Sequence, residues 1–255
     1  MNRPGRTLSI YAIAVYLFLH LPLLILATFS FNATRLSVWQ GFSLHWYSAA
    51  FQSSELVEAA WNSLLIAIAA TLVSTFIGTL CAYGLWKRAS TWLSDSLYLS
   101  LVTPEIVTGI SLLAFYQWIF RFLRLPLGMH TVILAHISFS VAYVVIVVMA
   151  RLRTLDAQLE EAALDLGANE WQAFRHVTLP VIFPAVAAAA LLAFTVSFDD
   201  YVITSLVAGV DSETLPMAIY AIARRGVNPE VNAISAIIVV GLGVLILVSE
   251  RLRAS

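Results

Sequence analysis

The chain has 255 residues, of which 60% are hydrophobic and only 11% are charged, and its formal net charge is −1. A soluble domain normally carries about 25% charged residues, so this composition, with a mean hydropathy of +0.87, indicates an integral membrane protein. The single cysteine, Cys81, excludes an intrachain disulfide.

Six stretches are long and apolar enough, or nearly so, to cross a bilayer as helices of about 20 residues. They are residues 8–30, 61–86, 97–120, 130–150, 181–207 and 231–249. The first has no charge from Thr7 to Thr34, so we interpret it as an uncleaved span rather than a signal peptide. Because backbone groups must be satisfied inside a bilayer, we expect an all-α integral membrane protein with one domain over residues 1–255.

Lysine and arginine predict the orientation, because they are enriched in cytoplasmic loops. With the N-terminus in the cytoplasm, nine lie on that side and five on the other. The nine are Arg3, Arg6, Lys87, Arg88, Arg151, Arg153, Arg175, Arg251 and Arg253, and the five are Arg35, Arg121, Arg124, Arg224 and Arg225. This excess predicts that both termini are cytoplasmic.

A polar segment, "RLRTLDAQLEEAALDLGANEWQAFRHVTLPVIFP", separates the fourth and fifth spans. Apolar residues recur in it at helical spacing, and acids, including Asp156, Glu160, Glu161 and Asp165, occupy much of the rest. The pattern predicts an amphipathic helix that ends at Gly167, followed by a second helix capped by Asn169. Pro180 and Pro184 predict stops or kinks nearby. These residues alone leave open an ordinary amphipathic connector.

Within this segment, "EAALDLGANEWQAFRHVTLP" resembles the EAA loop of bacterial ABC-importer permeases. The matching positions are Glu161, Ala162, Ala163, Gly167, Leu179 and Pro180, and Val177 stands where the family often has isoleucine. The resemblance implies the fold of a type I ABC importer permease with six transmembrane helices. It also implies a coupling loop at residues 152–180, whose helix docks on an ATP-binding subunit. Glu170 in the second helix is included among the coupling residues.

Further stretches, among them "TPEIVTGISLL", "SFDDYVITSLVAG", "TLPMAIYA" and "RRGVNPEVNAISAI", resemble the spermidine/putrescine permease family over residues 60–250, and its C-type subunit most. The resemblance implies polyamine import across the bacterial inner membrane by this subunit. It implies a second homologous permease chain, two copies of an ATP-binding subunit and a periplasmic substrate-binding protein as partners. ATP and Mg would be held by the ATPase, so no cofactor, metal or nucleic acid is expected on this chain.

Three alternatives remain at this point. A related ABC importer for iron or aminoethylphosphonate would share most of these stretches. An ion-gradient-driven secondary transporter or a membrane scaffold would not need the EAA string. The sequence has no HExxH, GxSxG or GxxxxGK[ST] motif, so nothing supports an enzyme or an autonomous ATPase.

Acidic residues within apolar stretches are the candidates for substrate contact, because a carboxylate in a bilayer is costly and normally faces a cavity or a partner. Asp199 and Asp200 follow about twenty uncharged residues and precede Tyr201. They are either interfacial or capping acids, or contacts for the ammonium groups of a polyamine. The resemblance implies the second role.

Glu105 is a further candidate, since Pro104 can open the helix before it and Thr108, Leu112 and Tyr116 share its face. Its alternative role is a charge pair with Lys87 or Arg88. The expected substrate path therefore comprises Asp199, Asp200, Glu105, Tyr201 and Tyr116. His136, Ser140 and Tyr143 form a polar stripe on the fourth span, which we interpret as hydrogen bonding between helices.

Overall fold

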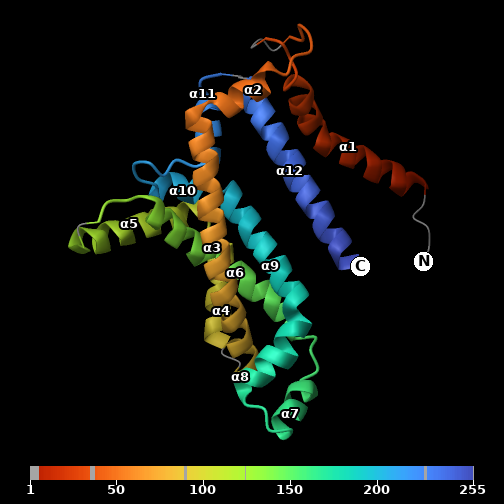
Figure 1. Cartoon of the computed structure of the whole chain (residues 1–255), viewed down its shortest axis with the longest axis vertical. Coiled ribbons are helices and arrows are strands. Elements are labelled where there is room, and N and C mark those ends of the chain that lie inside the picture. Colours follow the sequence, from red (N-terminus) through yellow and green to blue (C-terminus); the bar gives the residue numbers. More distant parts are fainter. Residues whose placement is uncertain (1–5, 35–37, 89–90, 124, 227–228, 255) are drawn as a thin grey trace. The chain divides into compact units, whose positions relative to one another are not determined.

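The computed structural model describes residues 6–34, 38–88, 91–123, 125–226 and 229–254. Its regular structure is helical, with one isolated β-bridge between Asn32 and Phe42 among these residues (Figure 1). The expected all-α class is therefore confirmed. Contacts divide the chain into two compact units, residues 1–57 with 218–255 and residues 58–217. The single domain expected over residues 1–255 stays a prediction.

The first unit is formed by α1 (Arg6–Phe29), α2 (His45–Gln52) and α12 (Pro229–Ala254), and both α1 and α2 pack against α12. Trp46 of α2 fixes the connection between α1 and α2, because its Nε1 donates a hydrogen bond of 2.8 Å to the carbonyl of Asn32. Although α1 lies against α12, no residue in the apolar stretch Leu8–Phe29 is buried.

The second unit holds both predicted functional regions. Its elements are α3 (Ser54–Lys87, from residue 58), α4 (Thr91–Val102), α5 (Glu105–Leu123), α6 (Met129–Leu152), α7 (Gln158–Asp165), α8 (Glu170–Ala173), the π-helical turn η1 (Phe174–Thr178), α9 (Leu179–Asp199), α10 (Val202–Val207) and the first residues of α11 (Leu215–Arg224). Figure 1 shows α7 and α8 together at one end of this unit, next to the start of α9.

Two apolar clusters hold the second unit together. The first joins α3, α6 and α9 through Ala82, Val148 and Ile182, all of them fully buried. Here α3 and α6 meet at Gly78, where an added Cβ would lie 2.7 Å from the side chain of Val144. The second cluster joins α3, α5, α6 and α10 through Ile66, Tyr116, Val132, Ile203 and Val207. The helices that carry the polar residues are thus fixed by close packing.

The described residues contain four helices that are long and apolar enough to span a membrane, or five if one bent pair counts as a single span. The predicted span 97–120 is interrupted at Pro104 and Glu105, as its sequence predicts. It consists of parts of α4 and α5, which are bent by 107° at the break before Glu105. Pro104 lies in this break, and a proline supplies no backbone N–H to continue a helix. The last predicted span falls in α12, whose described apolar part, Pro229–Gly241, is shorter than a span.

Of the stops or kinks predicted near Pro180 and Pro184, no stop is present, because the helix from Glu170 to Asp199 passes through both prolines. An irregularity does lie nearby: the π-helical turn Phe174–Thr178 directly precedes α9, and Pro180 stands in the first turn of α9. Of the cations that predict the orientation, Arg3, Arg35 and Arg124 lie outside the described residues.

Candidate functional site

The coupling loop has the turn that its sequence predicts. α7 ends at Asp165, and Gly167 adopts φ +92°, a backbone conformation that glycine takes without strain. The N–H of Gly167 donates to the carbonyl of Leu164 at 2.9 Å, and that of Ala168 donates to Ala163 at 3.1 Å. This pair of bonds is a Schellman motif. The sharp reversal after α7 is therefore fixed by hydrogen bonds.

The second helix of the loop begins as predicted at Asn169. The side-chain oxygen of Asn169 accepts from the N–H of Gln172 at 2.9 Å, and the Gln172 side chain accepts from the N–H of Asn169 at 2.9 Å. This capping box satisfies two of the N–H groups that a helix start leaves unpaired. The helix–turn–helix expected here is confirmed.

The predicted coupling residues lie mostly on the surface. Glu161, Ala162, Gly167, Glu170 and Pro180 are exposed, and Ala163 and Leu179 are half-buried. Apolar side chains accompany them: Leu159, Leu166 and Trp171 are 50%, 89% and 58% exposed. A Cβ added at Gly167 would have no neighbour within 4 Å. Large apolar side chains that are exposed beside acids are found on protein-binding surfaces.

Glu160 departs from the predicted pattern. The acids occupy the polar positions of α7, yet the Glu160 side chain is only 1% exposed. Its carboxylate accepts hydrogen bonds from Tyr83 Oη at 2.6 Å and Thr178 Oγ1 at 2.8 Å, and it forms an ion pair with Lys87. Burial alone would raise the pKa of Glu160, but the bonds from Lys87, Tyr83 and Thr178 outweigh burial and lower it. Glu160 is therefore held as a paired anion.

A cavity of about 390 Å³ lies where the α4–α5 bend meets α6, α9 and α10. All three predicted substrate-path acids, Glu105, Asp199 and Asp200, line it together with Tyr201. The rest of the lining mixes hydroxyl and apolar side chains: Ser100, Leu101, Thr103, Thr108, Phe139, Tyr143, Thr195, Val196, Val202 and Ile203. The fold thus brings together acids that lie nearly one hundred positions apart in the sequence.

The two adjacent aspartates differ in environment. The Asp200 side chain is 6% exposed, and its carboxylate accepts bonds of 2.7 Å from both the N–H and the hydroxyl of Thr204. Its Oδ2 also lies 3.5 Å from Nε2 of His136. Asp199, by contrast, is exposed, as is Glu105. The capping role left open for these acids therefore fits Asp200, while Asp199 and Glu105 present carboxylates to the cavity.

His136 connects three helices. This fully buried residue of α6 bonds through Nδ1 to the hydroxyl of Ser197 at 2.7 Å and through Nε2 to that of Thr204 at 2.9 Å. The interhelical bonding predicted for His136 is confirmed. Tyr143 from the same stripe lines the cavity, while the buried Ser140 hydroxyl has no hydrogen-bond partner in the described part of the chain.

Two further expectations concern single residues. Tyr116 is 4% exposed within the second apolar cluster and is not among the residues that line the cavity. Its place in the substrate path is therefore without support from the geometry. Lys87, suggested as an ion-pair partner for Glu105, pairs with Glu160 instead.

The amino-acid sequence of this chain is similar to those of known membrane transport proteins. The family described as "Binding-protein-dependent transport system inner membrane component" matches residues 74–254. The chain belongs to this family. The permease is 39% identical over 241 residues to the spermidine/putrescine transport system permease protein PotC of Escherichia coli (strain K12), which is 93% of this chain and 90% of PotC. It is also 39% identical over 246 residues to the putrescine transport system permease protein PotI of the same strain, which is 94% of this chain and 88% of PotI.

Solved structures show the same fold. A chain of a bacterial ABC transporter involved in the import of the acidic polysaccharide alginate superimposes on the permease with a TM-score of 0.74. The match covers 96% of the permease and 93% of that chain at 17% identity. The permease is therefore a multi-pass inner-membrane protein with the fold of an ABC transporter permease.

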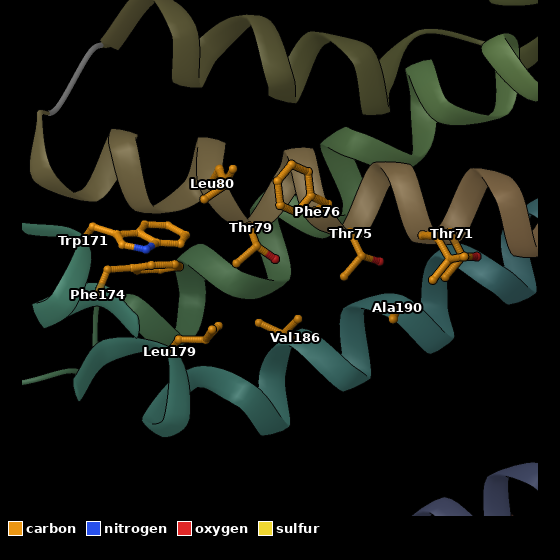
Figure 2. A pocket seen from close by; sticks show the side chains of 11 residues that line it. Thr71, Thr75, Phe76, Thr79, Leu80, Trp171, Phe174, Leu179, Val186 and Ala190 are labelled. Carbon is orange, nitrogen blue, oxygen red and sulfur yellow. The ribbon is translucent and has the colours of Figure 1, made fainter. Parts of the chain in front are cut away.

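The permease has a second hollow, an apolar groove of about 340 Å³ between α3 and α9. Figure 2 shows Trp171 and Phe174 at one end of it and Thr71, Thr75 and Thr79 along α3. None of the described residues that line this groove is charged. It does not suit a cation, so the acidic cavity is the candidate substrate site.

Proposed function

We propose that the permease is a membrane-spanning subunit of an ATP-driven importer, and that it carries polyamines of the spermidine and putrescine kind from the periplasm to the cytoplasm. The observation that carries this proposal is the cavity lined by exposed Glu105 and Asp199. It occurs in a chain that is 39% identical to two permeases whose names specify polyamine transport.

The chemistry of the lining supports a linear polycation. An ammonium group that leaves water needs a carboxylate or an aromatic face, and Glu105, Asp199, Tyr143 and Tyr201 offer both. The methylene segments of a polyamine need apolar contacts, which Phe139 and neighbouring aliphatic residues supply. The same acids disfavour aminoethylphosphonate, because its phosphonate group is an anion.

The coupling loop supports the ATP-driven mechanism. Its helix–turn–helix is rigid, and it exposes Leu159, Leu166 and Trp171 beside Glu161 and Glu170. In the proposed assembly this surface docks on one of two ATP-binding subunits, which hold ATP and Mg. Their closure moves the loop and switches the cavity between the two sides of the membrane. A second, different permease chain completes the path, and a periplasmic binding protein delivers the substrate. The permease itself needs no cofactor.

In this assembly the permease crosses the membrane six times with both termini in the cytoplasm. The spans are α1, α3, the bent pair of α4 and α5, α6, α9 and α12. Arg151, Arg153 and Arg175 lie in or beside the coupling loop, which is consistent with a cytoplasmic position. A cysteine-accessibility map of the loops tests this topology: labelling of a cysteine at Asp165 from the periplasmic side would overturn it.

Uptake measurements test the substrate class. Asp199→Asn and Glu105→Gln keep size and remove charge, so uptake of labelled spermidine per assembled complex should fall in each. The loss should be larger for spermidine than for putrescine, because spermidine has an additional ammonium group. Asp95→Asn, a change at an exposed acid of α4, is the matched control. Native rates for both amines in the Asp199/Glu105 double variant would exclude these acids as the polyamine contact.

A further inference from the structure

Glu160 is the only residue of α7 that is buried. Its side chain connects α7 to α3 and to η1. Tyr83 and Lys87 belong to the last turns of α3, and Thr178 is the last residue of η1. The Glu160 carboxylate contacts all three, with Oε1 facing Tyr83 and Lys87 and Oε2 facing Thr178. One side chain from the coupling loop therefore binds to two separate helical segments.

Aromatic contacts strengthen the same junction. The Tyr83 ring packs against that of Phe174 in η1, with centroids 4.5 Å apart. Nζ of Lys87 lies 5.9 Å from the Tyr83 centroid and 5.5 Å from the Trp86 centroid. Both carboxylate oxygens thus have donors, and the Tyr83 and Lys87 side chains that donate to Oε1 make further ring contacts. A satisfied buried network of this kind rigidifies the elements that it joins.

The position of Glu160 differs from that of its neighbour Glu161. Glu161 is exposed on the surface proposed to meet the ATPase, whereas Glu160 points into the permease. The two acids sit side by side on one short helix, so a displacement applied to the exposed face also moves the Glu160 carboxylate. Tyr83, Lys87 and Thr178 are the groups that would be moved with it.

We propose that Glu160 is a positioning residue that ties the coupling loop to α3 and to the start of α9. This assignment rests on the proposed docking of the loop on an ATPase. Glu160 does not contact the ATPase or the substrate. It transmits the movement of α7 into the two helices, so losing it uncouples ATP hydrolysis from transport without releasing the ATPase.

The test uses the complete complex in proteoliposomes, with the partner permease, the ATPase and the binding protein. The ATPase retained on the complex, ATP hydrolysis and uptake of labelled spermidine are measured together. Glu160→Gln keeps the shape of the side chain and removes its charge. The ATPase should stay bound and hydrolyse ATP, while spermidine transported per ATP falls about tenfold, within the roughly 5–150-fold range of couplings between sites. Asp95→Asn is again the matched control.

Exchanging the charges of Lys87 and Glu160 distinguishes a role in transmitting movement from a role in packing alone. Lys87→Glu and Glu160→Lys should each uncouple the complex, and the double variant should regain most of the transport per ATP. Recovery is expected because the hydroxyls of Tyr83 and Thr178 accept hydrogen bonds from an ammonium group as well as donate them. If the exchange is no better than either single change, the ion pair is not the connection.

The remaining outcomes are also decisive. If Glu160→Gln, Tyr83→Phe and Thr178→Val lower only the amount of assembled complex, with native transport per ATP in what assembles, the network is a packing element and the proposal is overturned. If the native complex itself shows no ATP-driven uptake or binds no ATPase, the proposed function fails first. That result is seen before any variant is compared, so the two failures are distinguishable.

Discussion

Gly167 offers the sharpest perturbation of the coupling loop. Its φ of +92° is a conformation that side chains with a Cβ rarely adopt, and an added Cβ would meet no atom within 4 Å. Substitution therefore acts through backbone strain and not through a clash within the permease. The left-handed conformation costs an L-residue roughly 1–2 kcal/mol. That strain opposes the two bonds that close α7, from Gly167 to Leu164 and from Ala168 to Ala163.

A strain of about 1–2 kcal/mol raises the population of the opened turn by about 5–30-fold. Gly167→Asn should be the mildest change, because asparagine tolerates this conformation better than other residues. Gly167→Ala should be intermediate, and the β-branched Gly167→Val should be the most severe. Gly84→Ala is the matched control, since Gly84 is helical and also has open space around it.

The assay is substrate-stimulated ATP hydrolysis, together with uptake per complex, in reconstituted proteoliposomes. We expect the loss of stimulation to be smallest in Gly167→Asn, larger in Gly167→Ala and largest in Gly167→Val. The permease should still insert in the membrane in all three. Native stimulation and uptake in Gly167→Val would refute the reasoning that a strained turn disables the loop. If all three variants lose the same amount of stimulation, the backbone strain at Gly167 is not the cause. That result would indicate instead that any side chain at this position blocks docking.

Three further predictions concern the second unit. His136→Ala should lower the melting temperature of the complex, because it removes bonds to Ser197 and Thr204 that are worth about 0.6–1.7 kcal/mol each in a membrane protein; an unchanged melting temperature would contradict the bridging role. Asp200→Asn should lower stability more than Asp199→Asn, and Asp199→Asn should lower spermidine uptake per complex; the reverse ranking, read from thermal unfolding and uptake, would show that the roles of the two acids are exchanged. The folded pKa of Glu160 lies below its ordinary value of 4.5, so its stabilisation is present above that pH and is lost as the pH falls through the folded pKa. The difference in melting temperature between the native protein and Glu160→Gln should therefore stay constant from about pH 5.5 to 8, and a decline within that range would mean that Glu160 titrates there.

Local features of the coupling loop could be predicted from the sequence, because their causes are local. α7 ends through bonds from the N–H groups of Gly167 and Ala168 to residues three and five positions earlier, and Asn169 caps its helix through Gln172, three positions on. The membrane class also followed directly from composition. The bend at Pro104 was predicted only as an opening of the helix, since its angle of 107° depends on what α4 and α5 pack against.

The roles of buried acids could not be predicted, because their partners are distant in the sequence. Glu160 looked like one acid among several on a polar face, and its partner Tyr83 lies 77 positions away. Asp199 and Asp200 are adjacent and chemically identical, and only the fold gives them different environments, with Asp200 buried and Asp199 exposed. His136, which lies against Asp200, meets Thr204 across 68 positions. Tyr116 shares a helical face with Glu105, yet the packing of α5 places it in the apolar core.

We propose that this permease moves a polyamine by using ATP hydrolysed on a partner chain. The most direct measurement is uptake of labelled spermidine into proteoliposomes that contain the whole complex, with ATP supplied on the side of the coupling loop. We expect saturable uptake that requires ATP and the binding protein and is competed by putrescine. Uptake that follows an ion gradient without ATP, or ATP-driven uptake that polyamines do not compete, would contradict it.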